Sequence, residues 1–342
     1  MRLSYIKYVA LATFLLTSFQ LNAQQNRPLS EQMANTVMDV WKDTLNTAPS
    51  GFRPVKWSYD LGVVYEGFEG IWKRTGNPTY FTTMQKSMDS YLGKDGTINN
   101  YKQTDFNIDH VKNGRTLLML YKVTGQQKYF KAATLLWNQL QQHPRTQEGG
   151  FWHKKIYPNQ MWLDGLYMGQ PFYAEYATLI KNEKAFDDIA NQFIWMEKNS
   201  IDAKTGLMYH GWDESKAEKW ADKTTGRSPH FWGRAMGWYG MGLVDVLDYF
   251  PTDHPKRKEL LAILGRFAAA VQKVQDKKSG LWYDILDMPN AKGNYHEASA
   301  SSMFVYTYAK AVRMGYLPKT YFAAADKGYK GISASFVERI SA

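Results

Sequence analysis

The sequence contains an internal repeat that limits the folds open to it. Residues 75–81, Thr-Gly-Asn-Pro-Thr-Tyr-Phe, recur 49 positions later as Thr-Gly-Gln-Gln-Lys-Tyr-Phe, and weaker copies begin at Lys181 and Leu317. Each copy lies between two stretches whose apolar residues repeat with the period of an α-helix. We therefore predict a series of helical hairpins, each closed by a short turn and an aromatic residue that anchors the next helix.

A second repeat marks the other ends of these hairpins. Glycine followed by aromatic residues recurs at residues 149–153, 205–210 and 279–284, within long loops. Short turns at one end and long aromatic loops at the other are typical of an α/α toroid, in which hairpins ring an axis and the loops build a cleft. Eleven helical patterns lie near residues 30–45, 59–75, 78–92, 107–124, 126–142, 162–181, 183–199, 230–250, 254–275, 296–314 and 318–338.

The number of helices sets the expected architecture. Six complete hairpins need one helix more than the eleven that the pattern contains. We therefore expect an all-α (α/α)6 barrel that lacks its last helix and the loop before it. An open arrangement of eleven helices is the alternative.

The N-terminus has the pattern of a secretory signal. Arg2 and Lys7 precede the apolar run 9–16, and a polar stretch follows it up to Ala23. The run is too short to span a bilayer, and no later stretch is long and apolar enough to do so. We predict a signal peptide over residues 1–23 and an exported, periplasmic or secreted, single catalytic domain over residues 24–342, without a membrane span.

Composition excludes several classes of function. The chain has no cysteine, so disulfides, thiolate metal sites and cysteine nucleophiles are ruled out. Its formal net charge of +10 is spread along the chain, which favours a small acidic partner over nucleic acid. No HExxH, GxSxG, phosphate-binding glycine loop or dinucleotide fingerprint is present, so we expect no metal and no cofactor.

Three acids lie at predicted helix starts, where long loops meet helices. Asp164 follows Tyr157-Pro158 in a segment rich in aromatic residues, Asp109 opens the helix predicted over 107–124, and Glu297 opens a later one. An acid in the first turn of a helix is either a partner for the helix dipole or a reagent. Both interpretations stay open for each residue on this evidence.

Two histidines and an arginine accompany these acids. His153 and His210 end two of the Gly-aromatic repeats, so we expect them to face the same end of the fold, as solvated loop residues or as site residues. Arg234 lies between Trp232 and Trp238, which are core residues or a sugar platform. A planar guanidinium in such surroundings needs a carboxylate partner, from the protein or from an acidic sugar.

With these residues assembled, the chain resembles an unsaturated rhamnogalacturonyl hydrolase of glycoside hydrolase family 105, and more distantly the unsaturated glucuronyl hydrolases. The resemblance runs from about residue 30 to the C-terminus and is carried by residues 157–165, 231–238 and 297–301. It implies an (α/α)6 barrel with Asp164 as general acid and base. It also implies substrate contacts from Tyr59, Asp109, His153, Trp162, His210, Trp232, Arg234 and Trp238.

The resemblance further implies an unusual reaction. Such enzymes remove a 4,5-unsaturated uronic acid from the non-reducing end of lyase-generated oligosaccharides by hydrating the C4=C5 double bond, so the carboxylate-separation rule for glycosidases does not apply directly. We expect burial by Trp162 and Tyr167, and the like charge of Asp109, to raise the pKa of Asp164. Asp109 would tune Asp164, while Arg234 and a histidine hold the substrate carboxylate.

Two other functions remain open at this point. An ordinary inverting glycosidase on the same toroid would use Asp109 and Asp164 as its acid and base. A catalytically inactive carbohydrate-binding protein would keep the sugar platform without turnover.

Overall fold

A computed structural model describes residues 27–41 and 56–338. The described chain is mainly helical and forms two compact units, one ending at Asn100 and the other beginning at Tyr101. The predicted signal peptide over residues 1–23 lies outside the described residues. Within them, no helix is both long and apolar enough to cross a membrane.

The first unit contains a helical hairpin preceded by one further helix. Its elements are α2 (Leu29–Trp41), α3 (Tyr59–Thr75) and α4 (Pro78–Asp89). The predicted turn is present: Gly76 ends α3 with a φ of 69°, a left-handed conformation that favours glycine, and Asn77 caps α4 through the backbone N–H of Thr79. Phe81 then packs on Trp72, with ring centroids 4.9 Å apart, as the anchoring aromatic.

The second unit contains four more hairpins. They are α5 (Gly114–Thr124) with α6 (Gln127–Gln142), α7 (Leu163–Leu179) with α8 (Ala185–Ser200), α9 (Gly233–Val246) with α10 (Arg257–Lys273), and α11 (Ala298–Arg313) with α12 (Phe322–Ser335). The described residues thus hold eleven α-helices in the predicted order. The all-α class predicted from the repeats is confirmed.

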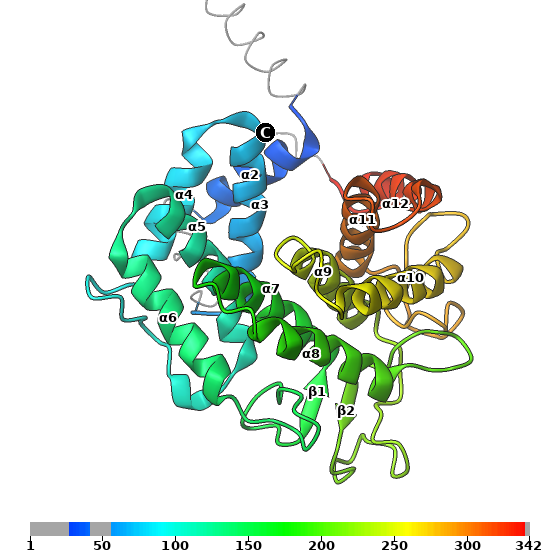
Figure 1. Ribbon diagram of the computed structural model, residues 1–342. Coiled ribbons are helices and arrows are strands. Elements are labelled where there is room, and N and C mark those ends of the chain that lie inside the picture. The colour runs from blue at the N-terminus through cyan, green and yellow to red at the C-terminus, as the bar shows by residue number, and fades with distance from the viewer. Residues whose placement is uncertain (1–26, 42–55, 339–342) are drawn as a thin grey trace, which may run out of the picture. The chain divides into compact units, whose positions relative to one another are not determined.

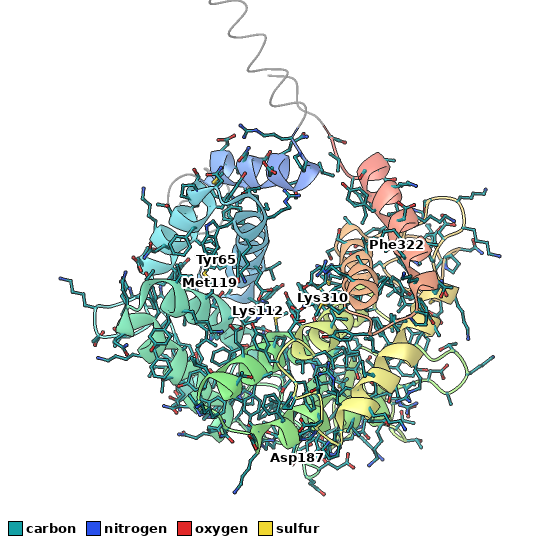
Figure 2. The ribbon with its side chains drawn as sticks, turned by 45° about the horizontal axis from the view of Figure 1, so that its top comes forward. Tyr65, Lys112, Met119, Asp187, Lys310 and Phe322 are labelled. Atoms are coloured by element: carbon teal, nitrogen blue, oxygen red, sulfur yellow. The ribbon has the colours of Figure 1, made fainter. Side chains whose placement is uncertain are left out.

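Each hairpin of the second unit has an inner and an outer helix (Figure 1). The inner helices α7 and α9 are buried on nearly all sides, and α9 packs between α7 and α11. A Cβ atom at Gly242 would lie 3.2 Å from the backbone of Leu166, so glycine lets α7 and α9 approach closely. Figure 2 shows that Lys310 lies on the inner helix α11, whereas Asp187 lies at the outer edge, on α8.

The loops before the inner helices contain short elements that the sequence did not predict. Strand β1 (Gln160–Trp162) pairs antiparallel with β2 (Gly211–Asp213), with Trp162 opposite Gly211. The ribbon places α7 directly after one strand and residue 210 directly before the other. Three 3₁₀ turns complete the described elements: η2 (Gln103–Asp105), η3 (Ile108–Asn113) and η4 (Lys319–Tyr321).

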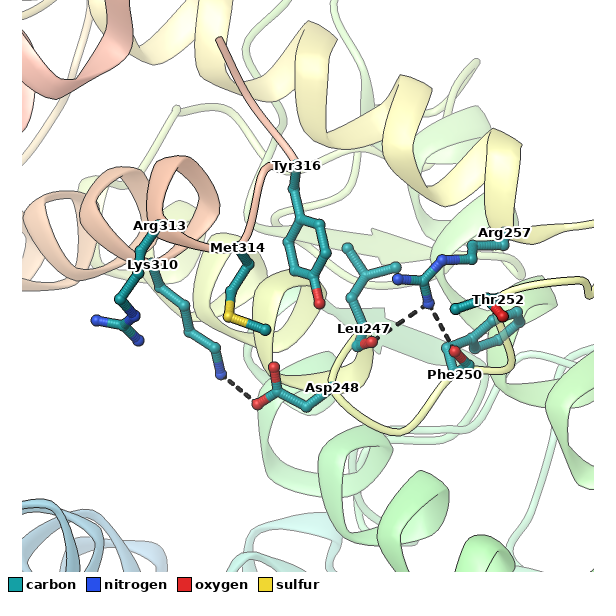
Figure 3. Close-up of a pocket in the computed structure, with 9 residues that line it drawn as sticks. All are labelled: Leu247, Asp248, Phe250, Thr252, Arg257, Lys310, Arg313, Met314 and Tyr316. Atoms are coloured by element: carbon teal, nitrogen blue, oxygen red, sulfur yellow. Dashed lines mark hydrogen bonds and ion pairs between the residues drawn. The ribbon is translucent and has the colours of Figure 1, made fainter. Parts of the chain in front are cut away.

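A hollow of about 640 Å³ lies at the C-terminal ends of α9 and α11 (Figure 3). Three of its charged groups are already engaged. Lys310 Nζ lies 2.5 Å from a carboxylate oxygen of Asp248. The guanidinium of Arg257 donates to the carbonyl oxygens of Leu247 and Phe250. The hollow is at the opposite ends of the helices from Asp164 and Arg234, which lie in the first turns of α7 and α9.

Candidate active site

Asp164 and His210 form the centre of the candidate site. The backbone N–H of Leu163 donates to the carbonyl oxygen of His210, which continues the β1–β2 pairing and brings the next side chain, Asp164, to the imidazole. Asp164 Oδ2 lies 2.9 Å from His210 Nε2, and the Asp164 side chain is 14% exposed. Neither atom makes a well-aligned hydrogen bond within the described residues, so this close contact has spare bonding capacity.

The pKa of Asp164 corrects our expectation. Burial raises the pKa, as predicted, but the close contact with His210 and the charge of His210, with a smaller contribution from His153, outweigh burial and lower the pKa below its ordinary value. The expectation of a raised pKa was wrong because it counted the aromatic surroundings and Asp109 but not the imidazole in contact. Without a ligand, Asp164 is therefore a carboxylate at neutral pH.

Asp109 lies beside this pair, in a different local structure from the one predicted. It belongs to the 3₁₀ turn η3 rather than to the first turn of an α-helix, and the side chain of Asn107 caps its backbone N–H. The Asp109 carboxylate lies 2.7 Å from Lys154 Nζ and 3.4 Å from His153 Nε2. Sequence reasoning missed Lys154, although its position directly after His153 in a candidate segment was the available signal.

His153 interacts electrostatically with both Asp109 and Asp164. Its side chain is 3% exposed, and burial lowers its pKa although the charges of Asp109 and Asp164 raise it. The ring is therefore neutral at neutral pH. Its Nδ1 atom has no hydrogen-bond partner within the described residues and would lie 3.2 Å from a Cβ atom at Gly165, so glycine leaves room for this imidazole.

Aromatic rings line the candidate site. Trp162 stacks on His153 and on Tyr157, with centroids 4.4 and 5.0 Å apart, and contacts His210 edge-on. Trp232 also contacts His210 edge-on, with ring centroids 4.9 Å apart. The Trp162 indole is fixed because its Nε1 donates to Gln160.

Arg234 has bonding capacity to spare. Its guanidinium lies 4.9 Å from the centre of the Trp232 ring and 3.5 Å from Glu297 Oε1, and its side chain is 37% exposed. Nε of Arg234 is buried without a hydrogen-bond partner among the described residues. Glu297 is committed to α11, where it caps the backbone N–H of Ala300 and accepts from Ser299. Arg234 is thus suited to an additional carboxylate.

The remaining predicted residues lie further from Asp164 or in the other unit. Trp238 is buried and stacks on Tyr167 at 4.9 Å, so it supports α7 behind the acid. Tyr59 begins α3 in the first unit, and its substrate contact stays a prediction. Over residues 27–41 and 56–338, no three histidine, aspartate or glutamate side chains gather in a way that could hold a metal ion.

Comparison with known proteins places this chain in a family. The model of Glycosyl Hydrolase Family 88 matches residues 29–340. The unsaturated rhamnogalacturonyl hydrolase YesR of Bacillus subtilis is 32% identical over 252 residues, which cover 72% of this chain and 68% of YesR. A 24.9 kDa protein in the picA locus of Rhizobium radiobacter is 37% identical over 174 residues, which cover 51% of this chain and 73% of that protein.

A solved structure agrees with these matches. A family 105 glycoside hydrolase from C. acetobutylicum is 46% identical and superposes with a TM-score of 0.87, covering 92% of this chain and 85% of that one. The predicted fold class, an α/α toroid of helical hairpins, is confirmed. The chain therefore belongs to Glycosyl Hydrolase Family 88, with relatives among the family 105 glycoside hydrolases.

Proposed function

We propose that this hydrolase removes a 4,5-unsaturated uronic acid from the non-reducing end of lyase-generated oligosaccharides, most of all those of rhamnogalacturonan, by hydrating the C4=C5 double bond. The contact between Asp164 and His210, enclosed by tryptophans and close to Arg234, is the observation that carries the proposal. The similarity to YesR, an unsaturated rhamnogalacturonyl hydrolase, supports the rhamnogalacturonyl preference.

Proton transfer begins at the Asp164–His210 pair. Asp164 is the carboxylate of the pair in the free enzyme, because its pKa is lowered, and in this proposal His210 supplies the proton that Asp164 receives. An anionic substrate adds negative charge and excludes water, and both effects raise the pKa of a nearby carboxyl group. The proton then passes from His210 Nε2 to Asp164 Oδ2 across their 2.9 Å contact.

The chemical steps follow from a protonated Asp164. Its proton goes to C4, and the double-bond electrons form the new C–H bond and leave positive charge at C5 that the ring oxygen shares. The Asp164 carboxylate then takes a proton from water as the water oxygen bonds to C5, giving a hemiketal. The hemiketal opens to a ketone at C5, and C1, now a hemiacetal carbon, releases the remaining sugar as an alcohol.

Other side chains position the reactants. Arg234 receives the uronate carboxylate on the exposed part of its guanidinium, with the sugar ring against Trp232. Asp109, held by Lys154, accepts hydrogen bonds from sugar hydroxyls or from the attacking water. We further propose that residues 1–23 direct export, so that the enzyme acts on pectin fragments in the periplasm or outside the cell.

The test is incubation with defined unsaturated disaccharides, galacturonyl-rhamnose and glucuronyl-containing, while the ultraviolet absorbance of the double bond is followed. We expect the absorbance to fall as sugar is released, faster with the galacturonyl substrate. Sugar release at unchanged absorbance would instead indicate an ordinary inverting glycosidase. Binding without any turnover would indicate an inactive carbohydrate-binding protein.

A further inference from the structure

A second hollow, of about 450 Å³, lies in the loop between β2 and α9. None of the proposed chemistry uses it. Its lining combines two aromatic rings with charged and hydroxyl-bearing side chains, namely Tyr209, Trp220, Asp222, Thr225, Arg227 and Ser228.

The hollow and the candidate active site meet at Gly211. A Cβ atom at Gly211 would lie 3.3 Å from Trp162 and 3.4 Å from Trp220, so the two indoles lie side by side over this glycine. Ser228 pairs with Gly211 through two hydrogen bonds of 2.9 and 3.1 Å. One lining residue, Tyr209, directly precedes His210, which contacts the acid.

The loop that forms the hollow is held in one conformation by its own hydrogen bonds. The buried Asp213 carboxylate accepts from the backbone N–H groups of Ser215 and Glu218. Gly226 has a φ of 80°, and a Cβ atom there would lie 2.3 Å from the Asp213 carbonyl oxygen, so only glycine fits. Glu218 also accepts from Gln160, which fixes Trp162. The hollow is pre-formed, as expected of a ligand site.

The lining chemistry suits a sugar. Trp220 is half-buried and Tyr209 has the Arg227 guanidinium 5.7 Å from its ring centre. Arg227 uses Nε to hold the Asn199 carbonyl oxygen, and the Asp222 carboxylate is occupied by Thr224 and Thr225. Aromatic faces with a few fixed polar groups are the usual lining of small-molecule sites.

We propose that this hollow is a subsite for a sugar of the leaving oligosaccharide, beyond the sugar attached to the unsaturated uronate. The proposal rests on the proposed function and extends it, because it makes the enzyme prefer oligosaccharides longer than a disaccharide. The cation at Arg227 favours an acidic sugar at this position. In a polymer that alternates rhamnose with galacturonate, the third sugar from the non-reducing end is acidic.

The experiment compares kcat/KM for the unsaturated rhamnogalacturonan disaccharide and tetrasaccharide. For the native protein we expect a higher value with the tetrasaccharide. Trp220→Ala should lower the tetrasaccharide-to-disaccharide ratio about tenfold, mainly through KM of the tetrasaccharide, because an aromatic contact in a pocket is a typical binding hot spot. Trp220→Phe should restore most of the ratio, and Arg227→Gln should lower it less.

Lys219→Ala is the matched control, since Lys219 is exposed in the same loop and does not line the hollow. It should leave the ratio unchanged. An active enzyme whose ratio is the same with and without Trp220 would overturn the subsite and leave the proposed function standing. A native protein that consumes neither substrate would overturn the proposed function and the subsite together.

Discussion

Charged residues of similar type lie at both ends of the inner helices in the second unit. At one end some of their polar atoms lack hydrogen-bond partners, and at the other end the side chains form ion pairs. At the N-terminal ends, Asp164, His153 and Arg234 each have a buried polar atom without a hydrogen-bond partner among the described residues. Toward the C-terminal ends, Glu175 and Asp245 are acids that are more fully buried than Asp164, with 5% and 1% exposed.

The C-terminal acids are fully engaged by cations from neighbouring helices. Asp245 lies 2.8 Å from both Arg115 and Lys310 and accepts a hydrogen bond from Tyr306. Glu175 lies 2.8 Å from Lys122. Burial raises the pKa of Asp245, but Arg115 and Lys310 outweigh burial and lower it. Four inner helices are thereby joined through paired charges.

The difference shows how a buried charge is used. A paired cluster has no capacity left for a ligand, and its removal costs stability because a charge is left without compensation. A cluster with unpartnered donors and acceptors has capacity for a substrate and for proton transfer. Three predictions test this division, the first at the N-terminal ends.

Asp164→Asn should lower turnover of unsaturated oligosaccharides by about a hundredfold to ten-thousandfold, the range typical of general acid–base groups. The amide keeps the shape of the side chain but cannot donate the proton to C4. Turnover is measured by loss of the double-bond absorbance, and thermal unfolding is measured in parallel. A rate like that of the native enzyme would refute the role of Asp164, and a large fall in melting temperature would assign it to stability.

Asp245→Asn should have the opposite pattern, with lower stability and little change in turnover. It leaves Arg115 and Lys310 without their shared acid, which should lower the free energy of unfolding by about 3–5 kcal/mol. Urea unfolding measures this loss, and kcat of the folded protein should stay near the native value. Asp187→Asn is the control, because the exposed pair of Asp187 with Lys256 should contribute less than about 1 kcal/mol. Equal effects of the two substitutions would contradict the proposed division.

The third prediction concerns His143, for which we expect the smallest effect and a dependence of stability on pH. Burial lowers its pKa to about 4, although its hydrogen bond to the Trp152 carbonyl oxygen partly opposes this. Its pKa in the unfolded chain is about 6.5, so between these values the unfolded chain binds a proton that the folded protein does not. Stability should therefore be complete above pH 6.5 and fall by roughly 3 kcal/mol as the pH drops to about 4.

The check on His143 is urea unfolding across this pH range. His143→Gln keeps a donor for the Trp152 carbonyl oxygen but does not titrate, so its stability should depend less on pH over the same interval. An unchanged slope would show that other groups cause the acid sensitivity.

Much of the fold was predictable because it depends on local patterns. The turn motif at Gly76 and its copy at Gly125 require glycine in a left-handed conformation, and the helices between such turns follow from apolar periodicity. Asp164 and Arg234 were identifiable because each interrupts an aromatic, apolar segment. Such residues stand out without any knowledge of tertiary structure.

The features that the sequence did not predict depend on contacts between distant residues. The lowered pKa of Asp164 comes from His210, and their contact exists only because β1 pairs with β2. Likewise the cluster at Asp245 gathers side chains from four helices, and no spacing along the chain shows which cation meets which acid. Local patterns locate charged residues but not their partners.

The β1–β2 ribbon decides which insertions and deletions in the chain would disturb the contact between Asp164 and His210. Its register fixes Asp164 against His210, so inserting or deleting a residue within either strand would turn one of these side chains to the opposite face. The loop between Asp213 and Gly226 lies outside this pairing, so its length does not alter the register. Rebuilding this part of the loop would therefore change the proposed subsite without moving the proposed proton-transfer pair.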